Sequence, residues 1–210
     1  MDILIGTTNP SKVERFKALL SGYDITFYTL QDLQIRTEPE EKGNTPEENA
    51  ILKAMFYGKY FDRVICNDSG LYFDELPLND QRQPGLHIRT PGGTRRRLND
   101  EEMIAYYMDL IHSLGGKVRA YYLDGIAVYH RGRIESFLSS SDDVKESSFY
   151  MVDHPSPKRQ PGWPLDSLSL DRQTLRYFVD DVDEELCGDS VVAGEYRRRL
   201  VDFLKKALAL

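Results

Sequence analysis

The N-terminal third of the chain alternates short apolar runs with amphipathic helical patterns, and this alternation constrains the fold more than any other feature. Residues 2–6, 24–28 and 64–66 are short apolar runs of the kind that form buried strands. Helical patterns start after Pro10 and after Thr45 and separate these runs. Strands that alternate with helices indicate an α/β fold in which the helices pack on a sheet.

The second of these helices carries its own start signals. Thr45 is a typical N-cap residue, Pro46 suits the first helical position, and Glu48 follows the cap by three residues. We expect this helix to run to about Phe61.

The remainder of the chain predicts a mixture of irregular and regular segments. Residues 79–99 are rich in Pro, Gly and Arg and are expected to be irregular, as are residues 139–171. The regular elements expected are a helix over 100–114, a hairpin formed by 119–129 and 133–138, and a last helix over 194–209.

The net charge excludes one class of function. The chain has 210 residues, 40% of them hydrophobic, and a formal net charge of -7. It is long enough to bury a substantial core. General nucleic-acid binders draw most of their binding free energy from basic residues that neutralise phosphates, so we expect no nucleic-acid partner. An anionic small substrate would need locally placed lysine, arginine or metal.

The cysteines and the hydropathy pattern predict where the protein acts. Cys66 and Cys187 form neither a metal-ligand pair nor a disulfide framework, which is typical of a reducing compartment. No apolar run is long enough to span a bilayer, and no signal-peptide pattern precedes the first strand. We therefore expect a cytoplasmic protein without a membrane partner.

Three polar clusters lie at the edges of the expected elements: Thr7-Thr8-Asn9-Pro-Ser-Lys12, then Glu48-Asn49 with Lys53, then Asn67-Asp68-Ser69-Gly70. Hydroxyls, an amide, a cation and free backbone N–H groups at a helix N-terminus suit a triphosphate. Taken alone, the first cluster is better explained by an ordinary capped helix with a solvated lysine. Glu48 alone is explained by a capping box.

Asp68 differs from the other candidates because it follows a buried strand. Open α/β sheets place binding groups at such strand ends, and Ser69-Gly70 is expected to form a tight turn there. Asp68 and Glu48 could together hold Mg²⁺ through oxygen and water and leave positions for phosphate oxygens. Asn67 could add a neutral ligand or only stabilise the turn.

The order and spacing of these clusters resemble the inosine triphosphate pyrophosphatases, also called non-canonical purine nucleoside triphosphate pyrophosphatases. That family opens with a strand and Thr/Ser-x-Asn-x-x-Lys, matched here by residues 7–12. It continues with Gly-x-Thr-Phe-x-Glu-Asn-Ala and a lysine, matched by residues 43–50 and Lys53. An acidic pair before Ser-Gly-Leu is matched by residues 67–71, and a later Pro-Gly with a downstream Arg by Pro84-Gly85 and Arg89.

The resemblance implies a fold and an activity. The implied fold is an elongated α/β domain over residues 1–210, with a central mixed sheet, flanking helices and two lobes around a nucleotide cleft, usually as a homodimer. The implied activity is Mg²⁺-dependent hydrolysis of a nucleoside triphosphate to the monophosphate and pyrophosphate. Phosphoryl chemistry of this kind depends on in-line positioning of the reacting groups and on cancellation of the charge on the phosphate oxygens, rather than on covalent catalysis.

The resemblance also assigns roles by motif matching. Phosphate contacts fall to Asn9 and Lys12, with Thr7 or Thr8 alongside, and Ser69 and Gly70 count with the substrate-binding residues. Glu48 and Asp68 would serve the metal, and Asp68 would also orient or deprotonate the water. Lys53 would neutralise charge near the α-phosphate.

The base-reading half of the family pattern is poorly matched. The family's Phe-Gly-Tyr/Trp-Asp-Pro motif falls on residues 160–166, where Trp163 is the candidate aromatic and Asp166 a shifted acid. The late Ser-His-Arg falls on residues 195–197, where only Arg197 is kept, and the first acid of the Asp-Asp pair is Asn67. Base selectivity is therefore not carried over. A nucleotide-binding module or regulatory protein with weakened catalysis is the main alternative, and a sugar-nucleotide or phosphate-ester enzyme is a third.

Overall fold

The computed structural model describes residues 1–93, 96–140, 143–144, 147–183 and 191–210. Cys187, one of the two expected structural thiols, lies outside the described residues. The chain divides into two compact units. The first comprises Met1–Ser69, Leu123–Ser140 and Gly194–Leu210, and the second comprises Gly70–Tyr122 and Ser141–Ala193.

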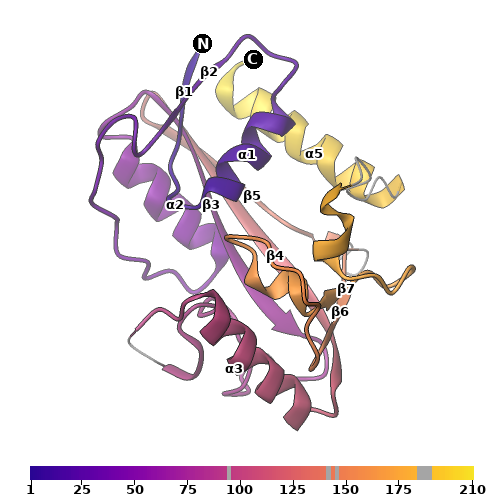
Figure 1. The fold of residues 1–210 in the computed structure, drawn as a ribbon. Coiled ribbons are helices and arrows are strands. Elements are labelled where there is room, and N and C mark those ends of the chain that lie inside the picture. Colours follow the sequence, from indigo (N-terminus) through magenta and orange to yellow (C-terminus); the bar gives the residue numbers. More distant parts are fainter. Residues whose placement is uncertain (94–95, 141–142, 145–146, 184–190) are drawn as a thin grey trace. The chain divides into compact units, whose positions relative to one another are not determined.

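The strands form one mixed sheet with the order β2-β1-β3-β4-β6-β7, and β5 pairs with β4 off this path. Their bounds are β1 Asp2–Ile5, β2 Thr26–Thr29, β3 Arg63–Phe73, β4 Lys117–His130, β5 Arg133–Leu138, β6 Phe149–Val152 and β7 Ser169–Leu170. Strand β1 runs parallel to β2 and β3. The pairs β4–β5, β4–β6 and β6–β7 are antiparallel. The predicted α/β class with a central mixed sheet and flanking helices is confirmed (Figure 1).

Two helices of the first unit cover the same face of its strands. Helix α1 (Pro10–Leu19) and helix α5 (Val191–Leu208) lie side by side (Figure 1). Their buried side chains share a core cluster with alternate strand residues: Val13, Phe16, Leu200 and Leu204 pack with Ile3, Ile5, Ile65, Ile126 and Val128. We call this side of the sheet the α1/α5 face.

The third helix of the first unit, α2 (Pro46–Tyr57), packs on the opposite face. Its cluster contains Ala50, Ala54 and Tyr57 with Leu4, Val64, Cys66 and Ala127. We call this side the α2 face. Because successive side chains of a strand point to opposite faces, Asn67 and Ser69 belong to the α1/α5 face with Ile65, whereas Asp68 belongs to the α2 face. Helix α2 ends at Tyr57, earlier than expected.

The start of α2 lies so close to β4 that only glycine fits between them. A Cβ atom on Gly125 would lie 2.2 Å from the backbone N of Glu47 and 2.5 Å from the carbonyl oxygen of Pro46. Such distances are far below van der Waals contact. The glycine therefore permits the close approach of α2 to the sheet.

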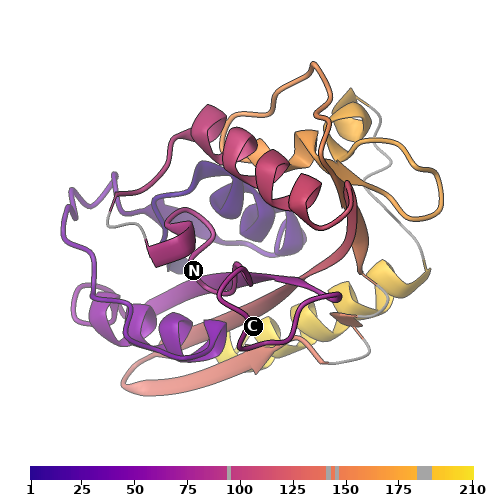
Figure 2. The same ribbon diagram turned by 90° about the horizontal axis from the view of Figure 1, so that it is seen from below.

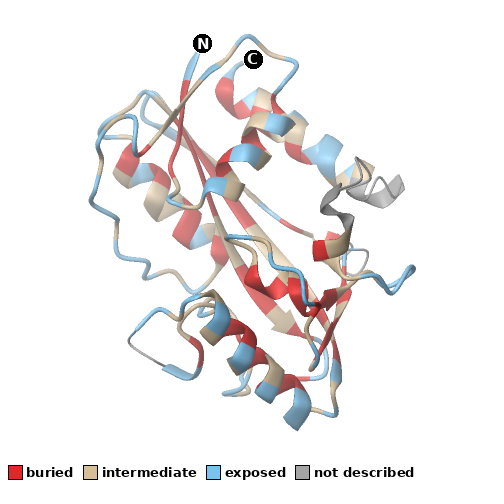
Figure 3. Cartoon of the chain, viewed as in Figure 1, coloured by how far each residue is buried: buried red, intermediate tan, exposed pale blue. Residues whose placement is uncertain are grey.

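Strand β3 runs straight through the residues expected to form a turn, and most of it is buried (Figure 3). The prediction of a tight turn at Ser69-Gly70 was wrong, because Gly70 does not adopt a positive φ and the strand continues to Phe73. Close packing explains the glycine instead. A Cβ there would lie 2.8 Å from the Tyr72 ring and 3.2 Å from the carbonyl oxygen of Gly85. Asp68 thus sits within a strand rather than at its end.

The predicted hairpin is confirmed. Strands β4 and β5 pair from Gly125 opposite Leu138 to His130 opposite Arg133, and they form a ribbon that Figure 2 draws in salmon. The turn consists of Arg131 and Gly132, both with positive φ.

The second unit holds helix α3 (Asp100–Ser113), which starts with a capping box between Asn99 and Glu102. Its core cluster includes Phe73, Tyr107, Ile111, Val118, Met151 and Leu168. Strands β6 and β7 lie in residues 139–171, for which irregular structure was expected. The sequence did not predict them because strands this short contain too few residues for a detectable alternation. In the parts of the chain that the structure describes, no helix has the length and apolar character to cross a membrane.

Candidate active site

The loop between β1 and α1 is closed by its own polar side chains. The Thr7 hydroxyl accepts a hydrogen bond from the backbone N of Asn9 (3.2 Å). The Asn9 side chain caps α1 by accepting from the backbone N of Ser11 (3.0 Å). Thr8 is exposed. Thr7 and Asn9 therefore fix the loop and cap the N-terminus of α1, whose helix dipole favours an anion.

Lys12 lies in the first turn of α1, as its third residue. Among the side chains that the structure describes, no carboxylate lies within 4.0 Å of its ammonium group. Burial, and next the charge of Lys53, lower the pKa of Lys12 to about 8, while Asp68 and Asp124 act in the opposite direction. A bound anion would strongly stabilise the charged form of such a half-buried lysine.

On the α2 face, Asp68 is held by two side chains of α2. Its Oδ2 accepts from Asn49 Nδ2 at 2.9 Å, and its Oδ1 accepts from Lys53 Nζ at 3.1 Å. Lys53 also bonds Glu41 at 2.6 Å. Although burial lowers the pKa of Lys53, the charges of Asp68 and Glu41 outweigh burial and raise it. The structure thus pairs Asp68 with Lys53, and Lys12 of α1 lies within electrostatic reach of both.

The capping box expected at the start of α2 is only half formed, because the carboxylate of Glu48 binds the residue before the N-cap rather than the N-cap itself. The backbone N of Glu48 donates to the Thr45 hydroxyl (3.1 Å), and its carboxylate accepts from the backbone N of Asn44 (2.6 Å). The side chain is exposed. Its neighbour Asn49 is buried and bonds Asp68, so Glu48 stands one residue from the side chain that links α2 to β3.

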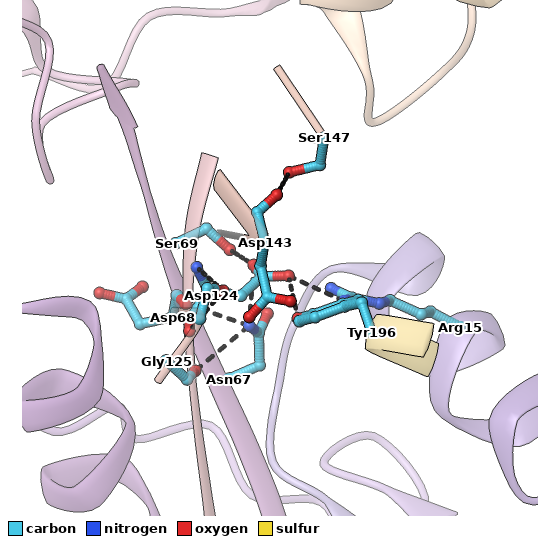
Figure 4. Close-up of polar contacts among 10 residues, drawn as sticks. Arg15, Asn67, Asp68, Ser69, Asp124, Gly125, Asp143, Ser147 and Tyr196 are labelled. Carbon is cyan, nitrogen blue, oxygen red and sulfur yellow. Dashed lines mark hydrogen bonds and ion pairs between the residues drawn. The ribbon is translucent and has the colours of Figure 1, made fainter. Parts of the chain in front are cut away.

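Sequence reasoning missed the most highly connected acid of the first unit, Asp124 on β4 (Figure 4). Its Oδ2 accepts from Arg15 at 2.8 Å and from the Tyr196 hydroxyl at 3.2 Å, and its Oδ1 accepts from Ser69 at 2.7 Å and from Asn67 Nδ2 at 3.5 Å. Burial alone would raise the pKa of Asp124, but the charge and hydrogen bond of Arg15 outweigh it and lower the pKa to about 2.

A signal for Asp124 was present in the sequence. The acid interrupts an otherwise apolar or aromatic strand pattern, Tyr121-Tyr-Leu-Asp-Gly-Ile-Ala-Val-Tyr129. An acid at such a position is costly unless it is paired. Its partner Arg15 lies on α1, and no local spacing connects the two.

These residues belong to a stretch that matches a known family. Residues 3–141 match the model of the Ham1 family, which is more than half of the chain. The chain belongs to the Ham1 family.

Curated relatives and solved structures agree with this family. The dITP/XTP pyrophosphatase of Thermoanaerobacter pseudethanolicus is 31% identical over 191 residues, which cover 89% of this chain and 84% of that protein. The dITP/XTP pyrophosphatase of Bacillus subtilis is 44% identical over 98 residues, 45% of this chain and 46% of that protein. The Ham1 protein of Staphylococcus aureus has a TM-score of 0.70 at 21% identity, covering 98% of this chain and 99% of that one. The HAM1 protein of Coxiella burnetii reaches 0.72 at 20% identity, covering 99% and 100%. These structures share the fold.

All the residues expected to read the base lie outside the stretch that matches the Ham1 model. Trp163 and Asp166 belong to the second unit, where Asp166 lies in a short 3₁₀ helix, Pro164–Ser167. Burial raises the pKa of Asp166 to about 7. Arg197 is exposed on α5, whereas Tyr196 beside it turns inward to Asp124.

The donor set of this Ham1 chain fits a hard cation. Asp68 and Glu48 offer carboxylate oxygens, which Mg²⁺ prefers. Across the described residues, no group of three or more His, Cys, Asp or Glu side chains forms a ready-made metal cage. Two carboxylates suffice for an ion that keeps several waters and shares phosphate oxygens with its substrate.

Proposed function

We propose that this nucleoside triphosphate pyrophosphatase, a hydrolase of the Ham1 family, uses Mg²⁺ to cleave a non-canonical purine ribo- or deoxyribonucleoside triphosphate to the monophosphate and pyrophosphate. The observation that carries the proposal is the pair of lysines beside Asp68, one of which, Lys12, has no carboxylate partner among the described residues. The dITP/XTP pyrophosphatases that resemble the chain support the purine class.

The phosphates would bind at the N-terminus of α1. Lys12 would supply the cation, at the positive end of the α1 dipole and beside the loop that Thr7 and Asn9 hold in shape. Thr8 is exposed and free to reach a phosphate oxygen, and Ser69 and Gly70 would line the strand beside them.

Asp68 would orient the attacking water and take its proton. Asn49 and Lys53 hold both oxygens of this carboxylate, so its direction is fixed before the substrate binds. Lys53 would then neutralise charge that develops on the α-phosphate as the α–β phosphoanhydride bond breaks.

Glu48 and Asp68 would hold the magnesium. When bound, Mg²⁺ cancels phosphate charge and lowers the pKa of its waters. The variant Glu48→Gln would test the metal role of Glu48, because glutamine keeps an oxygen that can accept from the backbone N of Asn44 and removes only the charge.

The base would be contacted by Trp163, Asp166 and Arg197. With its pKa raised to about 7, the Asp166 carboxyl group can either donate a hydrogen bond to a base or accept one. A single domain over residues 1–210 made of two lobes, a homodimer and a cytoplasmic location stay predictions.

The proposal is tested with purified protein, Mg²⁺ and a panel of inosine, xanthosine, deoxyinosine and canonical triphosphates. We expect pyrophosphate release, fastest for a non-canonical purine, and a loss of at least about 1,000-fold in kcat/KM for Asp68→Asn. Asp109→Asn, an exposed acid of α3, is the matched control and should keep the wild-type rate.

The outcome separates the alternatives. If no nucleotide yields pyrophosphate with any divalent metal, the proposed pyrophosphatase activity is wrong. Tight nucleotide binding with a residual turnover that Asp68→Asn leaves unchanged would favour a binding module or regulatory protein. Products other than pyrophosphate would favour a sugar-nucleotide or phosphate-ester enzyme.

A further inference from the structure

Asp124 gathers side chains from three elements at one buried point on the α1/α5 face. Arg15 comes from α1, Ser69 from β3 and Tyr196 from α5, and each donates to the carboxylate of Asp124 (Figure 4). The side chain of Asp124 is only 16% exposed. Its charge is therefore paired and hydrogen-bonded, as a buried charge must be.

We propose that Asp124 is a positioning residue of the active site. Its carboxylate is the second negative charge beside β3, in addition to that of Asp68. It also fixes α1, and with it Lys12, against the strand that carries Asp68. This inference rests on the proposed function. Arg15 stands three residues after Lys12, so the two side chains lie near each other on one helix surface. Holding Arg15 at 2.8 Å therefore also sets where the ammonium group of Lys12 lies.

The charges around Lys12 show that both acids act on the same point. Asp68 and Asp124 both raise the pKa of Lys12, although they stand on opposite faces of the sheet. This is possible because β1 ends at Ile5, before the level of Asn67 on the neighbouring β3. Beyond that end, Lys12 is within electrostatic reach of both faces.

Asn67 explains why the second acid is on β4. Its Nδ2 donates to the carbonyl oxygens of Asp68 and Gly125, at 3.0 and 3.3 Å, and faces Asp124 Oδ1 at 3.5 Å. A carboxylate at position 67 would lose all three donations and would place a like charge against Asp124. The amide at 67 and the acid at 124 are thus complementary. The acidic pair that the sequence lacks is restored from a neighbouring strand.

A cycle of four proteins tests this relocation of charge: wild type, Asn67→Asp, Asp124→Asn, and the double variant. We expect Asp124→Asn to lose about 30-fold in kcat/KM, because it leaves Arg15 without its counter-charge. Asn67→Asp should lose a similar factor through like-charge repulsion. The double variant should recover at least about tenfold over either single variant, since it carries one acid and one amide again.

Kinetics are measured well below each variant's midpoint of thermal unfolding, so that only folded protein is compared. A residue that merely supports folding would leave kcat/KM of the folded variants unchanged, and that result would overturn the proposal. Asp80→Asn, which breaks an exposed Asp–Arg pair of 2.7 Å in the second unit, is the matched control and should match wild-type kinetics.

The same cycle is read by thermal unfolding without nucleotide, which does not depend on activity. The double variant should unfold at a higher temperature than both single variants. If it unfolds no higher than the less stable single variant, or if it does not fold, the charge has not been relocated and the proposal fails. If wild type hydrolyses no nucleotide while the unfolding cycle shows this recovery, the proposed function fails and the pairing of positions 67 and 124 stands.

Discussion

The two units treat a buried carboxylate in opposite ways. Asp124 in the first unit has its pKa lowered to about 2, whereas Asp166 in the second has its pKa raised to about 7. Burial raises the pKa of both acids, and the difference is Arg15, whose charge overcomes burial at Asp124. In the first unit a neighbouring cation therefore keeps the buried carboxylate ionised, and a triphosphate site needs such fixed charges. In the second unit the carboxyl group of Asp166 is about half protonated near pH 7.

The largest expected effect in this comparison concerns Lys12 of the first unit. Lys12→Met should lower kcat/KM by about 100-fold, because this half-buried ammonium group pairs directly with no carboxylate in the described part of the chain and therefore contributes most when an anion binds. Lys12→Arg should keep a larger part of the activity. Pyrophosphate release under matched conditions measures both.

The pH profile of the same pair tests the cause. With a pKa of about 8, Lys12 is charged below that pH and neutral above it, so wild-type kcat/KM should fall as the pH rises through about 8. The arginine variant should not show this fall, since its guanidinium stays charged. A fall of the same size and midpoint in both proteins would show that another group titrates.

A further prediction concerns acid unfolding of the first unit. The folded pKa of Asp124, about 2, is below its ordinary value of 3.8, so its contribution to stability is complete above pH 3.8 and is lost as the pH falls toward 2. The loss amounts to about 2 kcal/mol in the free energy of unfolding. Urea unfolding of wild type and Asp124→Asn should converge over this interval. Curves that stay parallel would contradict the charge pairing with Arg15.

The sequence predicted the elements of the first unit better than its site. The start of α2 was predicted because its signals are local: Thr45, Pro46 and Glu48 stand together at the N-cap and in the first turn. The hairpin of β4 and β5 was predicted for the same reason. The ion pair of Arg15 with Asp124 was not, because it joins residues 109 positions apart that meet only when α1 packs on the sheet.

The turn expected after Asp68 failed for a related reason. Gly70 suggested a turn, but a glycine is also needed where two backbones approach closely, and the sequence does not distinguish these causes. The short strand β7 depends on pairing with β6 rather than on its own two residues. Tertiary contacts therefore decided the positions at which local patterns were ambiguous.

The last and smallest effect concerns the acid of the second unit. The folded pKa of Asp166, about 7, is above its ordinary value of 3.8, so the folded state holds its proton longer than the unfolded state does. Stability therefore falls as the pH rises from about 4 to 7, and the cost is complete above pH 7. Asp166→Asn removes this cost. It should stabilise the protein by about 1 kcal/mol at pH 8, a value reduced by partial exposure to solvent, and by almost nothing at pH 3.5. Urea unfolding at the two pH values measures the difference. An equal effect at both pH values would mean that folding does not raise the pKa of Asp166, and the contrast with Asp124 would lose its basis.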